Sequence, residues 1–379
     1  MRPSSLLSLV LLTLGLLPSP AHAQTVATAP PRPTGAAPAT ATLPRVRLVA
    51  TGGTISNRNG GRLTAEELVA AMPGIERYVR PEAEQFANTA SSELTLKQWL
   101  DLARRINALV TEDPDLAGVV VTSGTDTLEE TAYFLNLTVR TTKPVVVVGS
   151  MRNPSTLGYE GAANLLEGFR VAASPEARGK GVLVVLNDEI NAARDVTKTD
   201  ALRLNTFQSR PYGVLGVVDS DRVVFYRDLV KRHTERSEFD VAGLAELPRV
   251  DIVMVYQGAS GDIIKAMVDQ GAKGIVIASA GAGATSGTQG EGIQYALDKG
   301  VFVVTSTRTG SGRIAARPRG TAAAPAPSND GDPRAGRAAG TDRRIAAEDL
   351  APVKARILLM LALSRTTSGA EIQRMFTDY

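Results

Sequence analysis

The chain has 379 residues, no cysteine and only two histidines. The lack of cysteine excludes disulfide bonds, a cysteine nucleophile and a zinc site built from cysteine and histidine. We expect His22 to be removed with a leader segment, which leaves His233 as the only histidine of the mature chain. His233 stands in a charged stretch, so we expect it at the surface and not in a Ser-His-Asp triad. Hydrolytic chemistry would then depend on Ser or Thr hydroxyls, with Lys, Asp, Glu or Tyr moving protons.

An excess of one charge is also missing. The chain has 42 Lys and Arg against 39 Asp and Glu, a net charge of +3, and the two signs are interspersed. A nucleic-acid-binding protein would gather its basic residues on one face, so no nucleic-acid partner is predicted. Two glycine-rich segments do not fit the nucleotide-binding motifs. Residues 280–287 do not have the glycine spacing of a dinucleotide site, and Gly52-Gly53-Thr54 is not followed by the Gly-Lys-Ser/Thr of a phosphate loop. No metal or organic cofactor is implied.

The first residues have the pattern of a secretory signal peptide. Arg2 is followed by an apolar run over residues 6–17 and by Ala21-His22-Ala23, a cleavage site of the A-x-A type. The run is shorter than the roughly 20 apolar residues of a membrane span. We therefore expect cleavage after Ala23, a periplasmic or secreted protein, and no membrane association of the mature chain. Residues 24–44 are mainly Ala, Thr and Pro, which predicts a disordered spacer.

The rest of the chain is predicted to form two α/β domains. Strand and helix patterns alternate over residues 45–226, which is typical of a parallel sheet covered by helices on both faces. This larger N-terminal domain would be the catalytic one, with its site at the carboxyl ends of the strands. The charged residues 227–249 would form a linker, and residues 250–379 a smaller flavodoxin-like or Rossmann-like domain. Within it, the Ala-, Pro- and Gly-rich residues 315–341 predict a flexible insertion.

Hydrophobic periodicity places the individual elements. One helix should begin near Thr127, because Thr127-Leu128-Glu129-Glu130 fits a capping box. The predicted strands are 46–50, 118–122, 144–149, 181–186, 250–256, 274–278 and 301–306, and the other predicted helices are 96–109, 263–268, 293–297, 353–363 and 371–375.

Two of the predicted strands end in small-residue turns that present a threonine. The first turn carries Thr54 and the second carries Thr125, followed directly by Asp126. Lys198 follows a third strand, and Ser91 precedes the first long helix. Taken singly, Asp126 could be a helix cap and Lys198 an ordinary solvated lysine. Because the carboxyl ends of parallel strands meet at one edge of a sheet, their joint placement favours a site that uses threonine as a nucleophile.

These segments resemble the bacterial type II L-asparaginases. The resemblance covers residues 46–379 apart from the 315–341 insertion. It implies hydrolysis of L-asparagine to L-aspartate and ammonia, with L-glutamine as a second substrate, in a homotetramer built from two intimate dimers. The matching segments are Thr-Gly-Gly-Thr-Ile at 51–55, Gly-Thr-Asp-Thr-Leu-Glu-Glu-Thr-Ala at 124–132, and residues 143–146, 149–152, 194–198, 231–241 and 354–359.

The resemblance also implies roles for the site residues. Thr54 would attack the side-chain amide carbon and form an acyl-enzyme, and Lys198 would assist deprotonation of Thr125. Asp126 would hold the α-ammonium of the substrate and Ser91 its α-carboxylate. Backbone N–H groups around Gly53 and Thr125 would form an oxyanion hole. The further substrate-binding positions are Ser92 and Ser150.

The chain departs from the family pattern in the lid and in the partner's contribution. Residues 57–62 carry no tyrosine, and Ser123 stands where a histidine is common. The glutamate that a partner subunit normally lends falls in the 315–341 insertion, and its asparagine region is 281–284. Two other functions therefore stay open: an amino-acid-binding protein of the periplasm without turnover, and an amidohydrolase acting on another amide, such as a peptide- or tRNA-linked one. A binding protein would not need Thr54, Thr125 and Lys198 together.

Overall fold

The computed structural model describes residues 42–316 and 341–379. The predicted signal peptide lies outside the described residues, as do most of the predicted spacer and most of the predicted insertion. In the part of the chain that is described, no helix is both long and apolar enough to cross a membrane.

The elements follow each other mainly as alternating strands and helices. The strands are β1 (Arg45–Gly52), β2 (Asn57–Arg58), β3 (Gly61–Arg62), β4 (Arg80–Thr89), β5 (Leu116–Thr122), β6 (Val145–Val148), β7 (Val182–Leu186), β8 (Glu189–Ala192), β9 (Thr197–Lys198), β10 (Phe207–Gln208), β11 (Gly216–Val218), β12 (Val223–Phe225), β13 (Val250–Met254), β14 (Gly274–Ser279), β15 (Phe302–Thr307) and β16 (Arg344–Ala346). The helices are α1 (Ala65–Ala70), α2 (Leu96–Glu112), α3 (Leu128–Thr138), α4 (Gly161–Ala173), α5 (Asp262–Asp269), α6 (Gln289–Asp298), α7 (Pro352–Leu363) and α8 (Gly369–Asp378).

The larger sheet has the strand order β12-β11-β8-β7-β6-β5-β1-β4 among the described residues. The strands from β4 to β7 are parallel, as predicted. The edge formed by β8, β11 and β12 is antiparallel, which makes the sheet mixed. The direction changes at a hairpin between β7 and β8, where Asn187 and Asp188 both have positive φ, 56° and 64°. Two such residues form the kind of tight turn that joins antiparallel strands.

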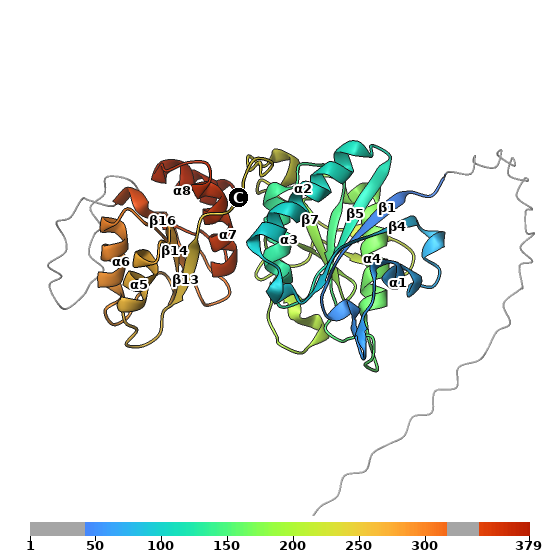
Figure 1. Ribbon diagram of the computed structural model, residues 1–379, viewed down its shortest axis with the longest axis horizontal. Helices are drawn as coiled ribbons and strands as arrows, with labels where there is room; N and C mark the ends of the chain where they lie inside the picture. Colours follow the sequence, from blue (N-terminus) through green and yellow to red (C-terminus); the bar gives the residue numbers. More distant parts are fainter. Residues whose placement is uncertain (1–41, 317–340) are drawn as a thin grey trace, which may run out of the picture. The chain divides into compact units, whose positions relative to one another are not determined.

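Alternating side chains of the central strands build a core on each face of this sheet. Val119 and Val121 of β5 pack with the helices α2 and α3, whereas Val120 packs with α1 and α4. Figure 1 shows the same arrangement, with α2 and α3 on one side of the strands and α1 and α4 on the other. Because both faces are covered, these strands read in the sequence as unbroken apolar runs.

The second sheet is parallel throughout, in the order β13-β14-β15-β16. Its strands pack with α5 and α6 on one face and with α7 and α8 on the other. The apolar residues of α7 belong to the same continuous core as those of α3. The fold is therefore a two-domain α/β fold, and a shared apolar core joins its two sheets.

The prediction that His233 lies at the surface was wrong. Its side chain is 2% exposed, and both ring nitrogens have partners: Nδ1 lies 2.9 Å from Thr234 Oγ1 and Nε2 lies 3.0 Å from Arg236 Nη2. The charged segment 227–249 also contains apolar residues, and two of them, Phe239 and Val241, pack into the core. These residues hold the segment against the protein, and the histidine is buried with it.

The predicted capping box at Thr127 was also wrong. Thr127 is the N-cap of α3, but its side chain makes no capping hydrogen bond. Its backbone N–H instead donates to Ser91 Oγ at 3.3 Å. The glutamate that would complete the box, Glu130, faces Arg356 at 3.9 Å. Tertiary partners have therefore replaced the local ones.

Burial lowers the pKa of His233 from 6.5 to about 4, and the charge of Arg236 acts in the same direction. A lowered pKa means that stability is fully present above the ordinary pKa and is lost as the pH falls from 6.5 towards 4. His233→Gln cannot titrate in this range and should be less stable than the wild type at pH ~7.5 because it loses the ring contacts. We expect the difference in Tm between the two proteins to shrink by about 2–4 °C at pH ~4.5. A thermal unfolding series over pH checks this, and a constant difference would contradict it.

Candidate active site

Two glycines bring the two threonine turns into contact. Gly53 has φ +91°, and a Cβ atom placed on it would lie 2.3 Å from the backbone nitrogen of Gly124. Only glycine fits such a conformation at such a distance. Thr54 and Thr125 each follow one of these glycines, so they lie on either side of the contact.

The strand ends behind the glycines are joined by side chains as well. Thr51 Oγ1 donates to the carbonyl oxygen of Thr122 at 2.6 Å, and Thr122 Oγ1 accepts from the Thr51 N–H at 3.1 Å. Ser91 packs on the same turn, because a Cβ atom on Gly124 would lie 2.8 Å from Ser91 Oγ. The carboxyl ends of β1 and β5 thus meet at one edge of the sheet, where open α/β sheets bind ligands.

An amine, a hydroxyl and a carboxylate form the centre of the cluster. Lys198 Nζ donates to Thr125 Oγ1 at 3.0 Å and to Asp126 Oδ1 at 2.7 Å. Thr125 is buried, whereas the side chain of Asp126 is 76% exposed. An ion pair with so exposed a partner contributes little to stability. The Asp126 carboxylate is therefore open to a ligand, and the hydroxyl of Thr125 is within proton-transfer distance of an amine.

Thr54 is held by backbone contacts and not through its hydroxyl. It begins a short 3-10 helix (Thr54–Ser56), is half-buried, and within the described residues its hydroxyl makes no hydrogen bond. The neighbouring carbonyls are fixed: Arg62 Nη1 donates to the Gly53 oxygen at 3.3 Å, and Tyr159 Oη donates to the Ile55 oxygen at 2.8 Å. The turn thus presents a hydroxyl that is free to react.

Five of the predicted site residues form a connected group, namely Gly53, Ser91, Thr125, Asp126 and Lys198. Ser92 is exposed beside Ser91 in the 3-10 helix Ser91–Glu93. Ser150 is fully buried after β6, where its hydroxyl donates to the carbonyl oxygen of Arg152 at 2.6 Å. The hydroxyl of Ser150 is thus engaged within its own turn.

No role in the site was predicted from the sequence for two charged residues, Glu129 and Lys354, that lie close to the strand carrying Lys198. Glu129 Oε1 accepts from Thr197 Oγ1 at 2.8 Å and from the Lys198 N–H at 3.2 Å. Lys354, on α7, is 1% exposed and lies 3.8 Å from the other carboxylate oxygen of Glu129. A signal was available for Lys354, because it shares a helix face with Leu358 and Leu361, both of which are fully buried.

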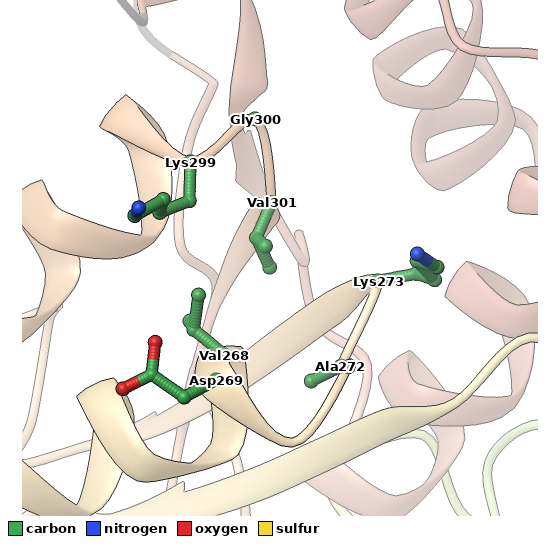
Figure 2. Close-up of a pocket in the computed structure, with 8 residues that line it drawn as sticks. Val268, Asp269, Ala272, Lys273, Lys299, Gly300 and Val301 are labelled. Atoms are coloured by element: carbon green, nitrogen blue, oxygen red, sulfur yellow. The ribbon is translucent and has the colours of Figure 1, made fainter.

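A hollow of about 300 Å³ lies in the second sheet domain, away from this cluster. It is found where β14 and β15 begin, the end opposite to the carboxyl edge that ligands favour. Figure 2 shows Lys273 and Lys299 at its rim with their amines pointing away from each other and out of the hollow. We assign it no ligand. Among the described residues, no group of three or more His, Asp or Glu side chains could hold a metal ion.

The fold and the cluster define a class: a two-domain α/β protein with a hydroxyl–amine site of the hydrolase type at its sheet edge. Residues 45–231 match the family described as asparaginase, N-terminal, and residues 249–376 match the glutaminase/asparaginase C-terminal domain. The chain belongs to the asparaginase family.

Several known proteins are similar over most of the chain. L-asparaginase 2 of Bacillus subtilis is 42% identical over 347 residues, which cover 89% of this chain and 87% of that protein. The glutaminase-asparaginase of Pseudomonas fluorescens biotype A is 39% identical, with 89% of this chain and 91% of that protein covered. A crystal structure described as a probable cytoplasmic L-asparaginase from Campylobacter jejuni superposes with a TM-score of 0.77 at 39% identity, over 89% of this chain and 100% of that one.

Proposed function

We propose that the protein is an L-asparaginase that hydrolyses L-asparagine to L-aspartate and ammonia, with L-glutamine as a second substrate. The observation that carries the proposal is the position of Lys198, whose amine bridges Thr125 and Asp126. The turn that carries Thr54 meets the turn that carries Thr125 where Gly53 approaches Gly124. Family membership and the names of the relatives agree with the proposal, since these include asparaginases and a glutaminase-asparaginase.

The proposed reaction has two covalent stages. Thr54 Oγ1 attacks the carbon of the side-chain amide to give a tetrahedral adduct, and the hydroxyl proton passes to the nitrogen. The C–N bond then breaks, ammonia leaves, and an acyl-enzyme ester remains. Water then attacks the same carbon, the ester bond to Thr54 breaks, and L-aspartate is released. Thr125 and Lys198 would relay protons in both stages. Backbone N–H groups around Gly53 and Thr125 would stabilise the oxyanion, at roughly 3–4 kcal/mol for each donor.

Asp126 and Ser91 are proposed to orient the substrate. The exposed carboxylate of Asp126 can receive an α-ammonium through a charge-assisted hydrogen bond. Ser91, at 6% exposure beside Gly124, would receive the α-carboxylate. A bound ammonium would share the Asp126 carboxylate with the amine of Lys198. Ser92 and Ser150 are kept in the proposal as further substrate-binding positions, outside the group formed by Ser91, Thr125, Asp126 and Lys198.

Two other functions would give different results with the same purified protein. A binding protein without turnover would bind asparagine and release no ammonia. An amidohydrolase for another substrate would release ammonia from a peptide- or tRNA-linked amide and little from free asparagine. Ammonia release from a panel of amides separates the three.

We also propose a homotetramer of two intimate dimers. An open sheet edge leaves the ammonium, carboxylate and amide of the substrate hydrated, and a partner's second domain would close it. The described segment proposed to do so is 281–286, and most of the other predicted segment, 315–341, lies outside the described residues. We expect activity to fall on dilution below the association constant. Sedimentation that shows a fully active monomer would rule this out.

A periplasmic or secreted location is proposed from the chain's own leader pattern at residues 1–23. The Campylobacter relative is described as cytoplasmic, so the support comes from the leader and not from that relative. The amino-terminal residue of the exported protein tests the cleavage after Ala23.

Thr54→Ala should abolish turnover and leave the fold intact. The residue is a half-buried turn position with little apolar area, so its loss removes the nucleophile and almost no core. Ammonia release and the Tm are the two measurements, and Thr367→Ala, at an exposed threonine between α7 and α8, is the control. Ammonia release near the wild-type rate by Thr54→Ala would show that another group is the nucleophile.

Lys198→Met should lower kcat by about 10²–10⁴-fold, the usual size of general-base assistance. The pH–rate profile should also become flat on its alkaline side, because the amine that gains activity as it loses its proton is gone. Asp126 is still present in this variant, so KM should change less than kcat. An unchanged rate with an unchanged profile would mean that Lys198 is an ordinary surface lysine.

A further inference from the structure

A continuous line of polar contacts runs from α7 of the second domain to Lys198. Lys354 on α7 faces Glu129, Glu129 accepts from the N–H of Lys198, and the amine of Lys198 reaches Thr125. We propose that Lys354 is a positioning residue for Lys198. It holds the strand that carries Lys198, and its positive charge compensates the carboxylate of Glu129, which contacts the Lys198 backbone. The inference rests on the proposed function and adds a role for the chain's own second domain.

Glu129 fixes the backbone of Lys198 to the turn that carries Thr125. It stands in the first turn of α3, two residues after Thr127 and three after Asp126 in the chain, so its backbone moves with theirs. One carboxylate oxygen accepts from both the Thr197 hydroxyl, at 2.8 Å, and the Lys198 N–H, at 3.2 Å. The start of α3 and the strand β9 are thereby held at a fixed separation. The distance from the Lys198 amine to Thr125 depends on that separation.

Lys354 holds the same strand from the other side. Its ammonium donates to the carbonyl oxygen of Arg194 at 2.9 Å and to that of Val196, the residue directly before β9. The second oxygen of Glu129 is buried and makes no hydrogen bond within the described residues, and Lys354 is the cation 3.8 Å from it. A buried carboxylate is costly without such compensation.

The charges around Lys354 come from two elements. Burial lowers the pKa of Lys354 to about 8. The carboxylates of Glu129 on α3 and of Asp195, just before β9, favour the charged form of Lys354, whereas the charge of Arg194 disfavours it. Around Lys198 the charged groups are Asp126, in contact with its amine, and Glu129, in contact with its backbone. The ammonium of Lys354 thus faces one of the two carboxylates that contact Lys198.

Loss of the Lys354 charge should therefore have two effects. The carbonyls of Arg194 and Val196 lose their common donor, which loosens the strand that carries Lys198. Glu129 becomes an uncompensated carboxylate beside Lys198, so the free amine should form only at higher pH. If Lys354 had a purely structural role, its loss would lower the stability of the protein and leave the pH dependence of the reaction unchanged.

The experiment compares four variants by ammonia release from asparagine over pH. For Lys354→Met we expect kcat to fall about 10–100-fold, KM to stay within about threefold, and the rising limb of the pH–rate profile to move to higher pH. In Lys354→Met/Glu129→Gln both charges are gone, and the limb should return towards the wild-type position. Glu129→Gln alone should move the limb to lower pH.

Arg356→Met is the matched control. Arg356 lies on the same helix and faces the adjacent glutamate, Glu130, at 3.9 Å, but Glu130 does not contact Lys198 among the described residues. Its variant should keep the wild-type profile. Equal effects of Lys354→Met and Arg356→Met, or a wild-type pH profile in Lys354→Met, would overturn the proposal. If Lys354→Met does not fold, Glu129→Gln becomes the deciding variant. A rising limb that moves to lower pH in Glu129→Gln supports the proposal, and a limb at the wild-type position overturns it.

A second readout does not need turnover. Trace acetylation of Lys198 by acetic anhydride, followed by mass spectrometry over pH, reports when its free amine appears. The proposal expects this pH to rise in Lys354→Met and to stay unchanged in Arg356→Met. If the labelling shifts but no amide is hydrolysed, the proposed function fails and the positioning role stands. If ammonia is released and the labelling does not shift, the positioning role fails alone.

Discussion

The close approach of Gly53 to Gly124 is the constraint on which the rest of the site depends. It requires a positive φ at Gly53 and no side chain at either position. It also requires the parallel register that pairs Ala50 of β1 with Thr122 of β5, since a shift would carry one turn past the other. Given that register, the hydroxyls of Thr54 and Thr125 follow at the same sheet edge. The helices on both faces serve to hold the two central strands in this relation.

The elements buried on both sides could be predicted from the sequence because nothing competes with their apolar pattern. The strand β4 could not. It lies at the edge of the sheet and alternates charged residues, and Glu82 and Glu84 pair there with Arg47 of β1. Such a strand has the composition of a loop, since its outward face is stabilised by cross-strand ion pairs and not by burial. Short antiparallel strands such as β11 and β12 could not be predicted for another reason, because three residues are too few to show an alternating pattern.

The site was predictable where residues adjoin a strand end and not where they act across domains. Thr54 follows β1 within a few residues, and Thr125 and Asp126 follow β5, so their placement depends mainly on topology. Lys198 instead ends the short strand β9, which pairs with β10. Glu129 was read as part of a helix cap, and Lys354 as one residue of an apolar helix. The ion pair between Glu129 and Lys354 joins residues more than two hundred positions apart, and no local pattern reports such a pair. His233 was misjudged similarly, because the segment is buried through tertiary packing of Phe239 and Val241, which the charged residues beside His233 in the chain do not reveal.

The charged edge of the larger sheet has a consequence for solubility. An edge strand offers unpaired N–H and C=O groups to any other chain, and this is a common route to aggregation. Here a strand added beside β4 would meet the side chains that pair Arg45 and Arg47 with Glu82. Hydrogen bonding from Arg45 lowers the pKa of Glu82, so the edge keeps its charges in mildly acidic surroundings. A chain without disulfide bonds, which cannot lock its fold covalently, is thus protected along this edge against strand-to-strand assembly.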